Sequence, residues 1–211
     1  MITNPDVERF LRAHAGGFSL PEVEAYAHAN YIPILKPETA QLLQFLCVTL
    51  NPSRILEIGT AIGYSTTLLS RYGAVTTVEK DAERAAYARE VLAQYAPEGN
   101  VHLIEDDAET VVRMLPDQHY DLIFLDANKS YYNRYLPDCK RLLKEGGVLV
   151  ADNVLFDGMV AQPGIPPYAK RALTMNLREF LDAITHDEEL TTTILPLGDG
   201  VSLSVKKKKV R

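Results

Sequence analysis

The segment RILEIGTAIGYSTTLLSRYGAVTTVEK (residues 54–80) decides the fold of this chain. It opens with a short apolar run at 54–59, which is typical of a buried strand. A glycine-containing turn then leads into a helical pattern, and the β-branched run at 75–80 predicts a second strand. A strand, a helix and another strand in this order are typical of a parallel α/β unit.

The same alternation continues to residue 153. Further strands are expected at 101–106, 120–126 and 147–153, and helices at 81–95, 108–115 and 131–147. Two last strands flank Gly198, Asp199 and Gly200, which suit a hairpin turn. We therefore predict an α/β fold: a Rossmann-like, doubly wound, mostly parallel sheet of seven strands, with helices on both faces and an antiparallel C-terminal strand.

The N-terminal region, 1–50, reads as helices that cover the site. Ser19 is a candidate N-cap with Pro21 in the first turn. Pro37 is expected to begin the next helix, and Asn51-Pro52 to end it. No linker divides the chain, so a single domain over 1–211 is expected.

The composition is that of an ordinary globular protein, with 46% hydrophobic and 24% charged residues among 211. No apolar run approaches the roughly 18 residues that span a bilayer. The first residues lack the pattern of a signal peptide, and Cys47 with Cys139 make no disulfide framework. We expect a cytoplasmic protein with reduced thiols and no membrane association.

Charge is unevenly distributed along the chain. The 22 Lys and Arg against 28 Asp and Glu give −6, but five of the positive charges lie in the tail KKKKVR (206–211). The remainder therefore carries 17 against 28, or −11. An acidic body argues against broad coating of nucleic acid and leaves room for a local basic patch. The tail is either a solvated terminus or such a patch.

Acidic residues stand at the end of every predicted parallel strand. They are Glu57, Glu79, Asp106 with Asp107, Asp126, and Asp152 with Asn153 beside it. Ligands of open α/β sheets bind at this edge. Because clustered carboxylates repel one another, a cationic ligand, a metal ion or both would relieve the repulsion.

The glycine turn after the first strand matches neither a dinucleotide fingerprint nor a phosphate loop. Glycines such as Gly59 let backbone approach a ligand closely. Ser65 lies near a helix start, where amide N–H groups can hold a carboxylate. Glu79, 20 residues after Gly59, is placed to accept two ribose hydroxyls. A nucleoside-bearing cofactor is indicated, and a nicotinamide dinucleotide remains open.

Asp126, Asp152 and Asn153 offer two carboxylates and one amide oxygen. Hard oxygen donors suit Mg²⁺ or another hard divalent cation. The absence of a Cys/His cluster argues against zinc. Turn or helix-cap roles are the structural alternatives for these three residues.

These motifs resemble the cation-dependent class I O-methyltransferases, the family of catechol and caffeoyl-CoA O-methyltransferases, which use S-adenosylmethionine. The matching stretches are EIGTAIGYS (57–65), VEKD (78–81), DA (107–108), FLDANK (124–129) and DNVLFDG (152–158). Within this family, three stretches look most like bacterial tRNA 5-hydroxyuridine methyltransferases: PILK (33–36), DNVLFDGMV (152–160) and LPLGDGVSLSVKKKK (195–209). Those enzymes convert 5-hydroxyuridine at the wobble position to 5-methoxyuridine.

The resemblance implies a role for each matching residue. The cofactor would be bound by Leu35, Glu57, Gly59, Ser65, Glu79, Asp107, Ala108 and Asp126. Asp126, Asp152 and Asn153 would hold Mg²⁺, and Lys129 would be the catalytic base. Two residues depart from the pattern: Asp106 stands where a small residue is common, and Asp157 where the tRNA enzymes can carry a basic one.

The implied chemistry restricts the acceptor to a molecule with two adjacent oxygens. A divalent ion bound to a hydroxyl lowers its pKa, and a lysine can then take the proton. Both 5-hydroxyuridine and a catechol meet this requirement. In a tRNA complex, Lys170, Arg171, Arg178 and the tail 206–211 could contact the anticodon-loop phosphates, and Tyr131, Tyr132 and Phe156 could stack on the ring of either acceptor.

Other functions stay open beside methylation of tRNA. The same chemistry could act on a small catechol-like or caffeoyl-type phenol. A non-catalytic nucleotide-binding module belongs to a different class, and a nicotinamide oxidoreductase would leave Asp126, Asp152 and Asn153 unexplained. The resemblance further implies a homodimer, with the N-terminal helices and the loop 154–168 as candidate contacts.

Overall fold

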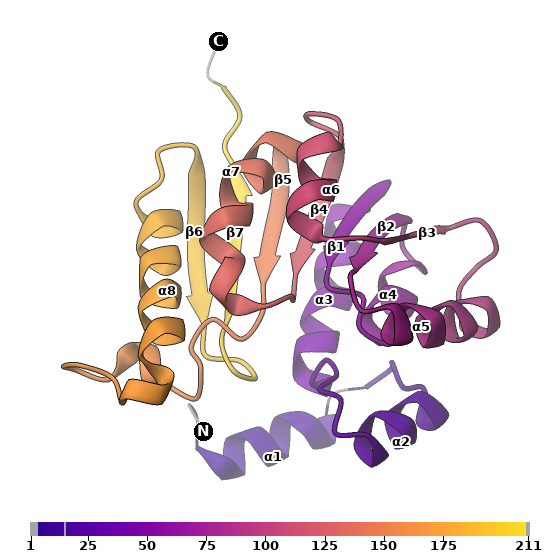
Figure 1. Ribbon diagram of the computed structural model, residues 1–211, viewed down its shortest axis with the longest axis horizontal. Helices are drawn as coiled ribbons and strands as arrows, with labels where there is room; N and C mark the ends of the chain where they lie inside the picture. Colours follow the sequence, from indigo (N-terminus) through magenta and orange to yellow (C-terminus); the bar gives the residue numbers. More distant parts are fainter. Residues whose placement is uncertain (1–3, 15, 210–211) are drawn as a thin grey trace.

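The structure is a computed structural model that describes residues 4–14 and 16–209 (Figure 1). Within these residues, seven strands form one sheet in the order β3-β2-β1-β4-β5-β7-β6. Their bounds are β1 Arg54–Ile58, β2 Ala74–Glu79, β3 Val101–Glu105, β4 Tyr120–Leu125, β5 Leu143–Ala151, β6 Leu190–Leu195 and β7 Val201–Lys206. Six strands run parallel, and β7 runs antiparallel to both of its neighbours. The predicted fold class is confirmed.

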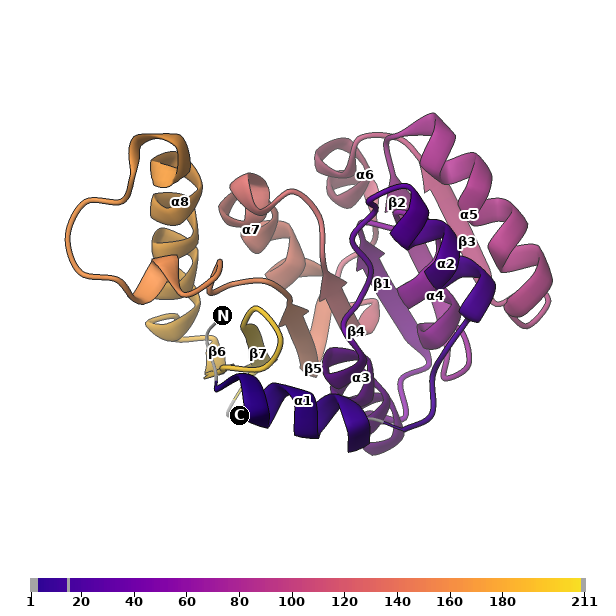
Figure 2. The ribbon, with the colours of Figure 1, turned by 90° about the horizontal axis from the view of Figure 1, so that it is seen from below.

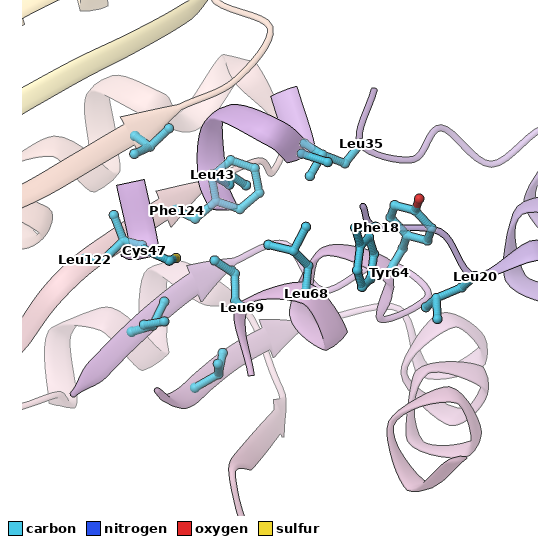
Figure 3. Close-up of a cluster of buried hydrophobic side chains, with 14 of the residues drawn as sticks. Phe18, Leu20, Leu35, Leu43, Cys47, Tyr64, Leu68, Leu69, Leu122 and Phe124 are labelled. Carbon is cyan, nitrogen blue, oxygen red and sulfur yellow. The ribbon is translucent and has the colours of Figure 1, made fainter. Parts of the chain in front are cut away.

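Helices cover both faces of the sheet, as Figure 2 shows. They are α1 Pro5–His14, α2 Pro21–Ala29, α3 Pro37–Leu50, α4 Tyr64–Leu69, α5 Ala82–Tyr95, α6 Ala108–Met114, α7 Tyr132–Leu142 and α8 Tyr168–Thr185, with short 3-10 turns at Lys129–Tyr131 and Met159–Ala161. Side chains alternate along a strand, so Phe124 of β4 joins the core under α3 and α4 (Figure 3), and Ile123 joins the core under α7 and α8.

Capping contacts and terminal residues explain the bounds of α5 and α3. Asp81 Oδ1 accepts the N–H groups of Glu83 and Arg84, both at 3.0 Å, at the start of α5. Pro37 begins α3, and Asn51 ends it in the left-handed conformation with φ 47°. Ser19 was wrongly assigned as a cap: the carboxylate of Glu24 accepts both the Ser19 hydroxyl and the Leu20 N–H instead.

The helix expected to continue to residue 147 ends five residues earlier. Leu143 already pairs with Tyr120 of β4, and the register shifts after this pair. Gly146, with φ 80°, belongs to this irregular start of β5 and not to a helix terminus. The Lys-Glu-Gly-Gly run resembles a helix end in sequence because glycine serves both purposes.

The helix α2 is docked beside α5 and α4 by side chains with polar ends. Tyr26 stacks on Tyr87 of α5 with ring centroids 3.8 Å apart. Tyr64 donates its hydroxyl to Glu24 at 2.8 Å. These contacts fix the segment that leads from α2 into α3 above the carboxyl ends of the strands. No helix among the described residues is long and apolar enough to cross a membrane.

Candidate active site

A cavity of about 520 Å³ opens at the carboxyl ends of the parallel strands. Ten of the eleven predicted site residues line it: Leu35, Gly59, Ser65, Glu79, Asp107, Ala108, Asp126, Lys129, Asp152 and Asn153. The residues 32–36 form the wall contributed by the N-terminal region. The topology therefore brings together side chains that lie as far apart in sequence as 35 and 153.

Glu57 is the predicted site residue that does not line the cavity. It is fully buried in β1 beneath the floor. Ser65 donates to its Oε1 at 2.5 Å, Thr77 donates to its Oε2 at 2.6 Å, and Thr66 donates to the same oxygen. Glu57 thus ties β1, β2 and α4 together under the glycine turn.

Burial dominates the ionisation of Glu57. Burial first, and the charge of Asp126 to a smaller extent, raise the pKa of this carboxyl from 4.5 to about 7, although the three hydroxyl groups act in the opposite direction. A buried carboxyl with only neutral donors holds its proton more tightly than one in water. Glu57 is therefore a structural support of the floor and a proton-binding group of the fold.

Gly59 allows the ends of β1 and β4 to approach closely. Its φ is 107°, and a Cβ atom there would overlap the carbonyl group of Asp126. The Asp126 N–H donates to the Ile58 carbonyl at 3.0 Å, next to this contact. Glycine is needed both for the backbone conformation and for the space.

Glu79 is held rigidly at the end of β2. The Ala61 N–H donates to its Oε2 and the Asp81 N–H donates to its Oε1, both at 2.9 Å. A carboxylate has about four lone-pair positions, so each oxygen keeps capacity for a further donor. Two hydroxyls of a ribose are donors of the required kind.

Asp107 has a structural role as well as a place in the cavity wall. Its Oδ1 accepts the Glu109 N–H at 2.9 Å and so caps α6. Lys80, Arg84 and Tyr135 line the cavity without having been predicted. The sequence gives no signal for Arg84, because a charged residue in the first turn of α5 is ordinary for a solvated helix.

Asp126 and Asp152 occupy equivalent places on neighbouring strands. They follow Leu125 and Ala151, which pair in the sheet, and the Asp152 N–H donates to Leu125 at 3.1 Å. Lys129 Nζ lies 3.0 Å from Asp126 Oδ1. Asp152 is only 4% exposed, and burial and then the charge of Asp126 raise its pKa well above the usual value, opposed by Lys129 and Lys36.

The donor set fits a hard divalent cation with open coordination positions. Asp126, Asp152 and Asn153 bring two carboxylates and an amide oxygen to one place, and the negative charge there exceeds what Lys129 offsets. Within 4–14 and 16–209, no three His, Cys, Asp or Glu side chains gather as in a closed metal centre. The remaining coordination positions would be available to water and an acceptor.

Two side chains proposed to stack on an acceptor are placed differently. Tyr132 is fully buried and donates its hydroxyl to the carbonyls of Leu125 and Asp152, so it supports the strand ends and is unavailable for stacking. Phe156 lies outside the cavity lining, with Lys170 Nζ 5.4 Å from its ring centroid. Tyr131 does line the cavity.

The match to known proteins covers most of this chain. A family model described as O-methyltransferase matches residues 19–207. The chain belongs to the O-methyltransferase family. Membership of this family argues against the two other functions that the sequence left open, a nicotinamide oxidoreductase and a non-catalytic nucleotide-binding module.

Relatives of this O-methyltransferase are found among curated proteins and solved structures. A "Probable O-methyltransferase" of Mycobacterium tuberculosis is 33% identical over 81% of this chain and 76% of its own length. A "putative caffeoyl-CoA O-methyltransferase" from Staphylococcus aureus is 31% identical with a TM-score of 0.85, covering 95% and 98% of the two chains. An O-methyltransferase from Bacillus cereus, solved with SAH, is 25% identical with a TM-score of 0.82, covering 96% and 97%.

Glu57→Gln is expected to remove a pH dependence of folding stability. Because folding raises the pKa of Glu57 from 4.5 to about 7, the folded chain binds the proton more tightly than the unfolded chain. This contribution is fully present below pH 4.5 and is lost as the pH rises through about 7. The change amounts to roughly 3 kcal/mol at about 1.4 kcal/mol per pKa unit.

Urea unfolding between about pH 5 and 8 measures this effect. The wild-type chain should lose stability relative to Glu57→Gln as the pH rises. Glu83→Gln, which removes an exposed carboxylate of α5, should follow the wild type. A constant difference between the wild type and Glu57→Gln over this range would contradict the assignment.

Proposed function

We propose that this O-methyltransferase moves the methyl group of S-adenosylmethionine to one of two adjacent oxygens of an acceptor, with the help of a divalent cation. One observation carries the proposal: the paired carboxylates of Asp126 and Asp152, with Lys129, share a cavity with the glycine turn and Glu79. The two carboxylates and Lys129 suit an acceptor hydroxyl that must lose its proton. The glycine turn and Glu79 suit a methyl donor that contains a nucleoside.

Residues of this chain account for the binding and proton-transfer steps. Glu79 accepts the ribose hydroxyls of the donor. Asp126, Asp152 and Asn153 would hold the cation, whose chemistry is to lower the pKa of a bound hydroxyl. Lys129, which lies beside Asp126, would receive the hydroxyl proton at Nζ as a neutral amine. The acceptor oxygen forms its bond to the methyl carbon as the carbon–sulfur bond breaks, and the sulfur leaves neutral.

We further propose 5-hydroxyuridine at the wobble position of tRNA as the acceptor. The motifs shared with the tRNA enzymes support this proposal, and so does an exposed rim on the loop 154–168 and α8. Tyr168 is 89% exposed, and the Arg171 guanidinium carbon lies 5.8 Å from its ring centroid. An exposed aromatic ring beside Lys170 and Arg171 suits a base next to a phosphate backbone. A tRNA acceptor would place the enzyme in the cytoplasm.

Two of the basic groups expected to contact tRNA are engaged elsewhere. Arg178 donates to the carbonyls of Val160, Gln162 and Gly164, at 3.0, 2.5 and 3.3 Å, and so holds the loop 154–168 against α8. Lys206 lies at the end of β7 that is remote from the cavity, and it donates to the backbone carbonyls of Lys140 and Leu143. The six residues of β7 span about 20 Å, so residues 206–209 lie at the opposite edge of the sheet, and residues 210–211 of the tail lie outside the described residues.

A small catechol-like phenol is the second candidate acceptor. The Staphylococcus aureus relative carries a caffeoyl-CoA O-methyltransferase description. The net charge of −6 and the acidic cavity also favour a small acceptor over a polyanion. Both acceptors would use the same reaction centre.

We also propose a homodimer formed through the N-terminal helices. On α3, Phe45 and Val48 are 66% and 69% exposed, and on α1 Phe10 is exposed as well. Large apolar side chains grouped on neighbouring helices are typical of a surface that is covered in an assembly. A second copy of the chain is the partner that the resemblance implies.

The cation requirement is tested with Asp152→Ala and with a chelator. Loss of this carboxylate should lower turnover by at least about a hundredfold, since the acceptor hydroxyl is then poorly ionised. Affinity for S-adenosylhomocysteine, measured by calorimetry, should change little, because Asp152 lies at the acceptor end. A chelator should abolish wild-type turnover, and added Mg²⁺ should restore it. Unchanged turnover in chelator would refute the requirement.

The acceptor is tested by methyl transfer to tRNA carrying 5-hydroxyuridine and to free catechol. Lys170→Ala with Arg171→Ala should raise the KM for tRNA by about tenfold and leave catechol unaffected, since two phosphate contacts are lost. Deletion of 208–209 removes two positive charges at the remote edge and is the matched control, with no expected effect. Methylation of catechol but not of tRNA by the intact chain would establish the small acceptor.

The dimer is tested by light scattering on the purified chain. A mass of twice 23.5 kDa is expected for the wild type. Phe45→Asp with Val48→Asp should give a monomer, because two charges cannot be buried in an apolar contact. Met114→Asp alters an equally exposed apolar residue on α6 and should leave the dimer intact. A monomeric wild type would rule out the assembly.

A further inference from the structure

The turn 196–200 between β6 and β7 packs between two walls of the cavity. On one side, a Cβ atom at Gly198 would lie 2.9 Å from Thr39 Oγ1 and 3.4 Å from Lys36 Cδ, at the start of α3. On the other side, a Cβ atom at Gly200 would overlap the side chain of Leu155. Both glycines have positive φ, 62° and 88°, so the turn needs glycine for its conformation and for its close contacts.

Three hydrogen bonds join this turn to the segment that follows β5. The Val154 N–H donates to the Gly200 carbonyl, and the Leu155 N–H donates to the Asp199 carbonyl, both at 3.0 Å. The Asp157 N–H donates to the Asp199 side chain at Oδ1, at 2.6 Å. Asp199 therefore binds the segment through both its backbone and its carboxylate.

The segment held in this way has an unfavourable backbone conformation. Asn153, Phe156 and Asp157 have φ values of 57°, 47° and 51°. Non-glycine residues rarely adopt the left-handed region, and such conformations persist when surrounding contacts enforce them. Asn153 lies at the start of this segment and lines the cavity beside Asp152.

The surroundings of Asp199 indicate a role for its hydrogen bond more than for its charge. Burial and, to a smaller extent, the nearby carboxylate of Asp157 raise the pKa of Asp199, while the hydrogen bond from the Asp157 N–H and the charge of Lys36 lower it. Burial thus outweighs the groups that favour a charge on Asp199. An uncharged side chain with an oxygen in the same place should serve the segment equally well.

We propose that Asp199 is a positioning residue for the acceptor half of the cavity: through Leu155 and Asp157 it holds the segment 153–158 in the conformation that places Asn153 beside Asp152. The inference rests on the proposed function, since it takes the acceptor to bind beside these two residues. The turn also touches Lys36, so it fixes the two walls of the acceptor half relative to each other.

Asp199→Ala and Asp199→Asn separate this role from general stability. Hydrogen exchange of the Leu155 and Asp157 amides is measured in the full-length chain without acceptor. In Asp199→Ala the Asp157 amide should exchange about tenfold faster, the effect of losing one ordinary hydrogen bond. Asp199→Asn keeps an acceptor oxygen and should stay near the wild type. Asp182→Ala removes an exposed carboxylate of α8 and serves as the control.

Kinetics with catechol and binding of S-adenosylhomocysteine give the functional readout. Asp199→Ala should raise the KM for catechol by about tenfold and leave S-adenosylhomocysteine affinity unchanged, and Asp199→Asn should restore the KM. If Asp199→Ala does not fold, Asp199→Glu replaces it in the comparison with Asp199→Asn, because the longer side chain displaces the oxygen that accepts the Asp157 N–H.

Unchanged exchange at Asp157, or an Asn variant as impaired as the Ala variant, would overturn the role. The exchange experiment needs no acceptor. If the proposed reaction is wrong, the wild type shows no methyl transfer. If this inference is wrong, exchange of the Asp157 amide is the same in Asp199→Ala as in the wild type.

Discussion

Negative charge gathered at the carboxyl edge of the sheet is the constraint on which the rest of the site depends. Asp126 and Asp152 follow paired residues of neighbouring strands, so the sheet itself holds them together. Like charges at this spacing destabilise each other unless a cation lies between or beside them. Lys129 supplies one positive charge at 3.0 Å from Asp126, and among the residues that the structure describes none forms a comparable ion pair with Asp152.

The polar groups beneath the cavity fix the ends of the strands through neutral hydroxyl groups, which add no further negative charge. Glu57 is surrounded by hydroxyl groups of Ser65, Thr66 and Thr77, and its raised pKa favours the neutral form. The buried Tyr132 hydroxyl donates to backbone carbonyls at the ends of β4 and β5. Neutral donors thus fix the strand ends beneath the cavity.

The sequence was sufficient for the sheet and for most of the cavity wall, because both follow from local patterns. Strand ends mark the ligand-binding edge of a parallel sheet, so acids such as Glu79 and Asp126 could be placed there before the structure was known. Glu57 could not be placed correctly from the sequence, because it lies within β1, one residue before the strand ends. Only its contacts with Ser65 and Thr77 show that it lies beneath the cavity and not in its wall. The roles of Arg178 and Lys206 depend on partners 14 to 66 residues away, which no local pattern encodes.

The two halves of the cavity are built in different ways, and this difference bears on acceptor identity. The proposed donor half would come from the turns that follow β1, β2 and β3, where the backbone N–H groups of Ala61 and Asp81 anchor Glu79. The proposed acceptor half would be formed by the segments that contain Lys36 and Asn153, and the turn 196–200 packs against both of these segments. Substitutions in 153–158 and in the turn 196–200 are therefore expected to change the acceptor and leave the donor site intact, because no strand of the parallel sheet has to move.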